Sequence, residues 1–227
     1  MCKCKICNIV FPPILCVTGA FLNVGIHLLA TGENLLPLYL DTIFTISVTL
    51  LVGPVWGCLT GALTNIIGHT NNFWGWEGYL FALCNIATAL VTWMFMRFFP
   101  QELSIVRAQT ENVKSRQLDK VMNLIFVLTL LSFALCLVIS ILGGLISVFI
   151  EILRNTAVSE PVLNPASPPV MFYNEIPLVL REILSRIPIN IIDRLISAFA
   201  GFGVAKLVSA ACNFVSSAPT KTRQNAK

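Results

Sequence analysis

One long apolar stretch of this chain limits what it can fold into. From Val121 to Ile150 no acidic or basic side chain appears, and the apolar run continues to Ile152. An α-helix crosses the bilayer hydrocarbon, about 30 Å thick, with roughly 20 apolar residues. This run therefore predicts a membrane-spanning helix that tilts, protrudes or bends, and Gly143-Gly144 is the expected place for a bend.

The composition of the whole chain agrees with a membrane environment. Charged residues make up 11% of the 227 residues, against about 25% in soluble domains. Hydrophobic residues make up 56%, and the mean hydropathy is +0.81. These values exclude a disordered protein, a nucleic-acid-binding module and an ordinary cytosolic enzyme.

The apolar pattern predicts an all-α integral membrane protein, a bundle of about six transmembrane helices in a single domain, 1–227. A Gly53-Pro54 turn signal separates the second span from the third, and Pro188 occupies a favoured first-turn position of the last span. The predicted spans cover residues 9–30, 36–52, 55–68, 79–99, 121–152 and 188–214.

The segments between the spans predict the orientation. A hydrophilic loop at about 100–120 and a basic tail at about 215–227 share one side with the N-terminus, and this side holds most of the lysines and arginines. Basic loops stay in the cytoplasm, so we expect both termini there, in a multi-pass protein of the cell membrane. The proline-rich loop at about 155–174 is then external, and 176–186, with Arg181, Glu182 and Arg186, reads as an interfacial helix.

Polar side chains inside a membrane are costly and face a cavity or a partner. With this orientation, every such group falls in the external half of its span. We therefore expect a cup that is open to the outside and has an apolar floor. The candidate substrate-binding residues are His27, Asp41, Asn65, His69, Asn85, Asn190, Asp193 and Arg194, joined by Asn72, Trp74 and Trp76 of the external loop that follows His69.

Each of these residues also has a structural interpretation. Asp193 and Arg194 are adjacent and can form an ion pair, alone or with Asp41, while Asn23 can tie two helices together. His69 and the two tryptophans also fit the aromatic belt at the membrane interface. Their combination of rings and amide donors suits an aromatic or heteroaromatic ligand.

Other patterns carry weaker predictions. Small residues four apart, such as Gly57 and Gly61 or Gly201 and Ala205, serve either internal helix packing or docking of another subunit. The N-terminal Cys2, Cys4 and Cys7 can be free thiols, carry palmitate or bind a metal, although a fourth ligand is absent nearby. Phosphate-loop, zinc-protease and serine-hydrolase motifs are absent from the sequence, so we expect no catalytic activity, no cofactor and no metal.

Five motifs stand out in the predicted spans: Leu38-Tyr39-Leu40-Asp41-Thr42-Ile43, Leu51-Val52-Gly53-Pro54-Val55-Trp56-Gly57, Gly61-Ala62-Leu63-Thr64-Asn65-Ile66-Ile67, Phe81-Ala82-Leu83-Cys84-Asn85-Ile86 and Pro188-Ile189-Asn190-Ile191-Ile192-Asp193-Arg194-Leu195-Ile196. Together these motifs resemble a known family, the substrate-binding S components of energy-coupling factor (ECF) vitamin transporters, and within it the riboflavin-transporter-like branch.

The resemblance implies a six-helix protein that captures a vitamin-like small molecule from outside. It implies partners as well: a membrane coupling subunit and two cytosolic ATPases, with release of the cargo when the protein topples in the bilayer. Family members dock the coupling subunit through an Ala-x-x-x-Ala-x-x-x-Ala face, which Cys16, Ala20 and Val24 match only in part, so helix 55–68 is the other docking candidate. The alternatives are a membrane sensor or accessory protein that binds without transporting, and a structural protein with an internal polar lock.

Overall fold

The computed structural model describes residues 5–31, 38–70, 78–103, 105, 114–157 and 177–217. All secondary structure in this part of the chain is helical. The six helices are α1 (Lys5–Thr31), α2 (Ile43–Val52), α3 (Pro54–Thr70), α4 (Gly78–Phe98), α5 (Lys114–Ala157) and α6 (Leu178–Ser217).

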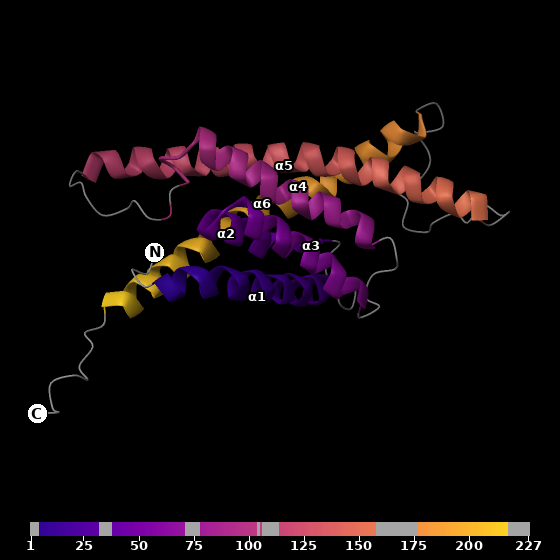
Figure 1. The fold of residues 1–227 in the computed structure, drawn as a ribbon. Helices are drawn as coiled ribbons and strands as arrows, with labels where there is room; N and C mark the ends of the chain where they lie inside the picture. The colour runs from indigo at the N-terminus through magenta and orange to yellow at the C-terminus, as the bar shows by residue number, and fades with distance from the viewer. Residues whose placement is uncertain are drawn as a thin grey trace, which may run out of the picture.

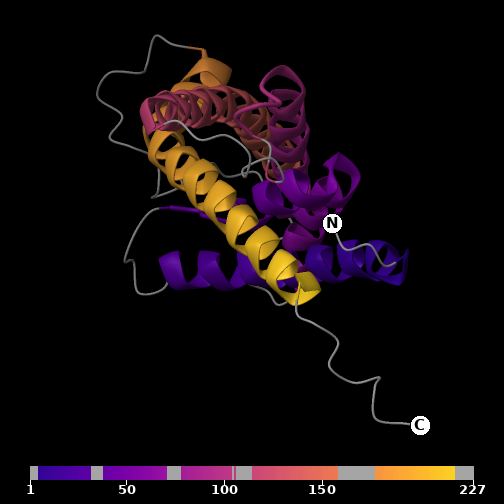
Figure 2. The same cartoon turned by 90° about the vertical axis from the view of Figure 1, so that its left-hand side faces the viewer.

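The helices run alternately back and forth through one bundle. In Figure 1, α1, α3 and α5 run from left to right, and α4 and α6 run back. As a result, α1 begins and α6 ends at the same end of the bundle, where α4 ends and α5 begins. Figure 2 shows α6 crossing the bundle diagonally, from its start beside α5 to its end on the side of α1.

Four of these helices are long and apolar enough to cross a bilayer, which indicates a multi-pass membrane protein. The qualifying segments are Phe11–Thr31, Gly78–Phe98, Leu118–Leu153 and Leu178–Phe214. The 17 residues of α3 rise about 25 Å and the 10 residues of α2 about 15 Å, against a hydrocarbon core of about 30 Å. The two short helices therefore depend on their neighbours for burial.

The predicted second span, 36–52, is wrong as a continuous helix. Only Ile43–Val52 is helical, and the preceding Leu38–Thr42 has an irregular backbone. Leu40 adopts a φ of 45°, in the left-handed region that a branched side chain rarely enters. Irregular backbone persists at membrane depth only where the protein satisfies its polar groups. The side chains that do so here are described below.

The predicted division between an interfacial helix at 176–186 and a last span from Pro188 is also wrong. Leu178–Ser217 is a single helix, and Pro188 lies in its interior. Helix α5 is also longer than predicted at both ends. It begins at Lys114, inside the loop expected at 100–120, and ends at Ala157, inside the loop expected at 155–174. The third and fourth spans match α3 and α4 to within two residues.

Small residues allow the helices to approach closely, which is the internal-packing interpretation of their spacing. A Cβ on Gly61 would lie 2.8 Å from the carbonyl oxygen of Asn85, and one on Gly201 would lie 2.9 Å from that of Ile43. Gly143 and Gly144 lie within the continuous α5, and a Cβ on Gly144 would meet Ile183 of α6 at 2.6 Å. These glycines bring α3 onto α4, α2 onto α6 and α5 onto α6.

The partial docking face of α1 is likewise turned inward. Cys16, Ala20 and Val24 are all buried within the bundle, and Gly19 lies beside Thr60 of α3. The opposite face, with Ile14 and its neighbours, is exposed. The apolar core itself lies mainly among α2, α5 and α6, and its fully buried members are Ile46, Leu103, Leu131, Leu135, Ala198 and Ala205.

Candidate functional site

The irregular segment Leu38–Thr42 is held by side chains from three separate helices. Asp193 of α6 accepts a hydrogen bond from the backbone N–H of Leu40 at 2.8 Å. His27 Nδ1 of α1 lies 2.8 Å from the carbonyl oxygen of Tyr39, and their rings are parallel with centroids 6.2 Å apart. Because Tyr39 and Leu40 lie outside the helices, these side chains supply partners that their backbone groups need in a bilayer.

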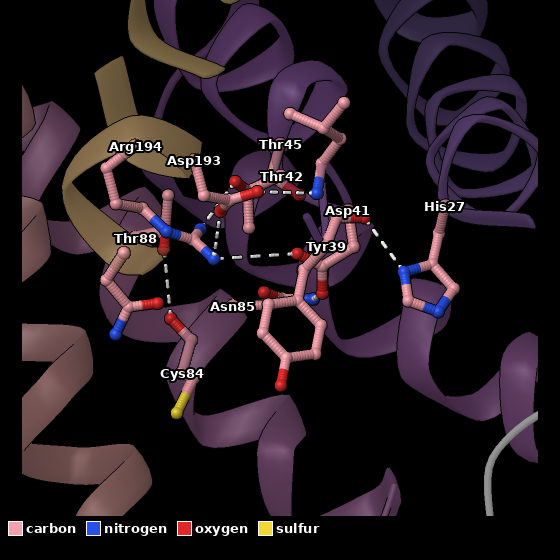
Figure 3. Close-up of polar contacts among 12 residues, drawn as sticks. His27, Tyr39, Asp41, Thr42, Thr45, Cys84, Asn85, Thr88, Asp193 and Arg194 are labelled. Atoms are coloured by element: carbon pink, nitrogen blue, oxygen red, sulfur yellow. Dashed lines mark hydrogen bonds and ion pairs between the residues drawn. The ribbon is translucent and has the colours of Figure 1, made fainter. Parts of the chain in front are cut away.

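Four polar residues lie together around this segment, and we call Asp41, Asn85, Asp193 and Arg194 the charge cluster (Figure 3). Arg194 Nη2 lies 2.7 Å from Asp193 Oδ2 and 3.7 Å from Asp41 Oδ1. Asn85 of α4 donates to Asp41 Oδ2 at 3.0 Å. Arg194 Nη1 donates to the hydroxyl of Thr42 at 2.6 Å. One guanidinium thus holds two carboxylates that are far apart in the sequence.

The charge cluster is closed in this structure. Asp193 is 0% exposed, Asn85 2% and Arg194 3%, and the side chain of Asp41 is 15% exposed. Burial of this kind requires that charges be paired, as they are here. Four of the groups that we expected to line an open cup are therefore bonded to one another, from the segment before α2 and from α4 and α6.

The pairing leaves some hydrogen-bonding capacity unused. Asp41 Oδ1, Asp193 Oδ2 and Arg194 Nε are buried and have no hydrogen-bond partner, although both oxygens lie within ion-pair distance of the guanidinium. The cluster also holds two carboxylates against one guanidinium. Acceptor capacity thus exceeds donor capacity, which favours a ligand group that donates hydrogen bonds.

Asn23 forms a second, neutral junction beside the first. Its amide nitrogen donates to Thr45 and Thr64, each at 3.1 Å, and its oxygen accepts from the backbone N–H of Phe44 at 2.9 Å. The side chain is fully buried. It joins α1, α2 and α3 at the first turn of α2, which is the structural role that we expected for this residue.

Asn65 and Asn190 bond groups outside the charge cluster. Asn65 donates to the carbonyl oxygen of Gly61 in its own helix at 3.1 Å, and Asn190 donates to Ser140 of α5 at 2.9 Å. His69 lies over the ring of Tyr79, with centroids 3.9 Å apart. Asn72, Trp74 and Trp76 lie outside the described residues, as do Cys2 and Cys4 of the N-terminal cysteine cluster.

Sequence reasoning missed three participants. Thr42 and the backbone of Leu40 belong to a segment that we expected to be helical, so their free polar groups were not anticipated. Arg186 was assigned to an interfacial helix, whereas it lies in the continuous α6 and contacts α4 and α5. Its position seven residues before Asp193, on the same helical face, is the signal that points to it.

Two hollows in the described part of the chain lie away from the charge cluster, between α5 and α6. One, of about 360 Å³, is an open apolar depression between α5 and α6, lined by Thr129, Leu195, Ile196 and Phe199. The other holds about 10 Å³ and is lined by Ser132, Phe133, Ile191 and Leu195. Neither is lined by a residue of the charge cluster.

Among the described residues, no group of three or more His, Cys, Asp or Glu side chains is arranged to hold a metal ion. Comparison of the chain with known protein families, with curated proteins and with solved structures gave no match. The family resemblance therefore rests on the sequence motifs, and it enters below as part of a proposal.

Proposed function

We propose that this protein is the substrate-capture (S) component of an ECF-type importer, which binds a vitamin-like small molecule from outside the cell. The observation that carries the proposal is the charge cluster, where Asp41, Asp193 and Arg194 meet within the membrane part of the bundle. Intramembrane ionisable groups are costly, and they commonly mark a ligand or ion site.

The proposal places all six helices in the bilayer, with both termini in the cytoplasm and the protein in the cell membrane. Lys114, Arg116 and Lys120 of α5 and Arg97 of α4 lie at the end of the bundle where α1 begins. This clustering of basic residues supports a cytoplasmic position for that end. Asn85 lies seven residues from the start of α4 at the opposite end, so the cluster is about 10 Å from the external end of that helix.

A closed cluster is compatible with ligand capture if hydrogen bonds to the ligand replace some of the bonds within the protein. A ligand that donates N–H or O–H groups would take up the unused oxygens of Asp41 and Asp193. The irregular Leu38–Thr42 segment contains Asp41 and is bonded by Asp193 at the N–H of Leu40, so it is the element whose bonds would rearrange. The proposal includes no catalytic step and no cofactor.

The partners follow from the resemblance, namely a membrane coupling subunit and cytosolic ATPases. Because Cys16, Ala20 and Val24 are buried, and Gly57 and Gly61 of α3 also pack inside the bundle, neither small-residue face is open for docking. We therefore place the docking surface on other residues of the bundle.

Purification in mild detergent, followed by mass spectrometry of the extracted small molecules, tests the proposal directly. We expect a co-purified ligand or, failing that, submicromolar binding of at least one member of a panel of vitamins and nucleobases. Absence of both would refute substrate capture.

Two variants test whether the charge cluster is the site. Asp193→Asn keeps an acceptor for the Leu40 N–H and removes the charge, and Asn85→Ala removes the donor to Asp41. We expect at least tenfold weaker binding for each, with normal membrane insertion. Thr129→Ala is the matched control, because that hydroxyl is exposed and bonds only its own helix at Ile125. Unchanged affinity in both site variants would place the ligand elsewhere.

A structural polar lock is the second candidate, and the burial of Asp193 and Arg194 favours it. A lock predicts that Asp193→Asn lowers the melting temperature and that wild type shows no ligand-dependent stabilisation. A membrane sensor would bind the ligand as the capture subunit does, but it would support no uptake in cells that express the coupling subunit and the ATPases.

A further inference from the structure

Arg186 is a second arginine of α6 that packs between helices, and unlike Arg194 it has no carboxylate beside it. Arg194 has two carboxylates within 4.0 Å, Asp193 and Asp41. Within the described part of the chain, Arg186 makes no ion pair, and Glu182, one turn earlier on α6, does not pair with it. A half-buried arginine among apolar helices is costly without a counter-charge, so its retention calls for a partner.

The surroundings of Arg186 form a shaped seat for its guanidinium. Nη2 donates to the hydroxyl of Ser147 on α5. The central carbon lies 5.6 Å from the ring centroid of Phe81 on α4. Gly143 leaves room on the third side, because a Cβ there would lie 3.4 Å from Nη1. Neutral groups of two helices thus hold the guanidinium in one place.

This seat leaves donors unused. Nε of Arg186 is buried and has no hydrogen-bond partner, while the residue as a whole is half-buried and so remains accessible. A guanidinium presents several N–H donors in a planar fork that matches the oxygens of a carboxylate or a phosphate. The missing partner is therefore an anion with two or more oxygens.

The register of α6 connects this seat to the charge cluster. Arg186, Asn190 and Asp193 are spaced by four and three residues, which places them on one helical face. Seven residues separate Arg186 from Asp193, or about 10 Å along the helix. This is the length of a vitamin-sized molecule, and Arg186 is the member nearer to the external end of α6.

We infer that Arg186 binds the anionic group, a carboxylate or a phosphate, of the ligand whose hydrogen-bond donors reach Asp41 and Asp193. This inference rests on the proposed function and narrows its substrate class to an anionic molecule with donors about 10 Å from the anion. The two ends of the site are complementary, since the charge cluster has excess carboxylate and the seat has an unpaired cation.

Matched ligand pairs that differ only in the anion test the inference. Riboflavin 5′-phosphate against riboflavin is a suitable pair, titrated calorimetrically in a neutral detergent. We expect the anionic member of a bound pair to bind roughly 10- to 100-fold more tightly to the wild type. Arg186→Gln abolishes this preference and leaves the neutral member unchanged, and Arg186→Lys retains part of it.

Arg181→Gln is the control, because it removes a positive charge from the same helix five residues away and keeps the seat intact. An unchanged anionic-to-neutral ratio in Arg186→Gln would overturn the inference, and so would an equal loss of the ratio in Arg181→Gln. If Arg186→Gln leaves the ratio unchanged while both ligands still bind, the inference about Arg186 fails but the proposed function stands. Failure of the proposed function would instead appear as no ligand binding at all.

Inorganic phosphate provides a test that does not need a bound vitamin. We expect millimolar phosphate, compared with chloride at equal ionic strength, to raise the melting temperature of the wild type but not of Arg186→Gln. A short-chain phosphatidylglycerol titration separates a lipid headgroup from a soluble anion. Stabilisation by the lipid alone, lost in Arg186→Gln, would assign the seat to a headgroup and overturn its role in ligand binding.

Discussion

Gly201 and Gly203 provide a paired test of the packing that builds the site. Both lie in α6, two residues apart, so replacement by alanine gains the same helix propensity, about 1 kcal/mol, in each. A Cβ on Gly203 would meet no atom within 4 Å. On Gly201 it would lie 2.9 Å from the carbonyl oxygen of Ile43 and 2.9 Å from Ile46 Cγ2.

The difference between the two variants isolates the cost of overpacking. Forcing a methyl group against buried backbone costs about 1–3 kcal/mol, because α2 has to shift. The carbonyl oxygen of Gly201 also accepts a hydrogen bond from Ser47 at 2.8 Å, which a shift of α2 would lengthen. For a chain of this length, where 1 kcal/mol shifts the melting temperature by about 2–4 °C, Gly201→Ala should melt roughly 2–12 °C below Gly203→Ala.

Thermal unfolding in one detergent, followed by circular dichroism, measures this difference. We expect Gly203→Ala to melt at or above the wild type and Gly201→Ala to melt below it. Because α2 follows directly after Thr42, the Gly201 variant should also bind ligand more weakly. Equal melting temperatures for the two variants would refute the close approach of α6 to the start of α2.

Other parts of the bundle give separate expectations. Asn23→Leu removes the acceptor of the Phe44 N–H and the donor to the hydroxyls of Thr45 and Thr64. It should destabilise by about 1–3 kcal/mol in a denaturant titration, whereas Thr70→Ala, which loses an exposed bond within its own helix, should have almost no effect. Pro188→Ala restores a backbone donor inside α6 and should raise the melting temperature; a helix that began at residue 188 would not be stabilised. A membrane-permeant maleimide should modify Cys212 faster than the buried Cys84, as mapped by peptide mass spectrometry.

Hydropathy alone predicts helices well where strong turn signals bound them. The Gly53-Pro54 pair separates α2 from α3, and Gly53 adopts a φ of 100°, which needs glycine. The same reasoning fails at Leu38–Thr42, because an apolar, unbroken sequence reads as helix. Only the distant side chains of Asp193 and His27 make the irregular backbone tolerable, and they are 153 and 12 residues away from their partners.

The start of α6 was predicted wrongly for the opposite reason: the local sequence signals a helix boundary where the structure has none. Pro188 normally starts a helix, and the charges of Arg181, Glu182 and Arg186 normally mark an interface. In the folded chain, Ser147 and Phe81 accept Arg186, and Ile183 packs onto Gly144 of α5. Tertiary contacts with α5 therefore extend the helix through a residue that local rules treat as its beginning.

That some polar side chains lie close together is predictable from sequence, whereas their pairing is not. The predicted orientation places Asp41, Asn85 and Asp193 in the external half of the membrane, and the structure joins all three through Arg194 and the Leu38–Thr42 segment. That Asn65 instead bonds its own helix could not be read from its position. The helical face on which a residue lies and the rotamer of its side chain decide which partner it bonds, and the depth of the residue does not.

Asn23 shows what a purely structural junction at this place requires. With one neutral amide it satisfies the N–H of Phe44 and two threonine hydroxyls, and it leaves no charge in the membrane. Holding the neighbouring N–H of Leu40 by the same means would need only an asparagine at position 193. The chain instead has two carboxylates and a guanidinium there, with a desolvation cost that a neutral network avoids. Charge beyond what the backbone needs is the feature that supports the proposed substrate binding over a neutral polar lock.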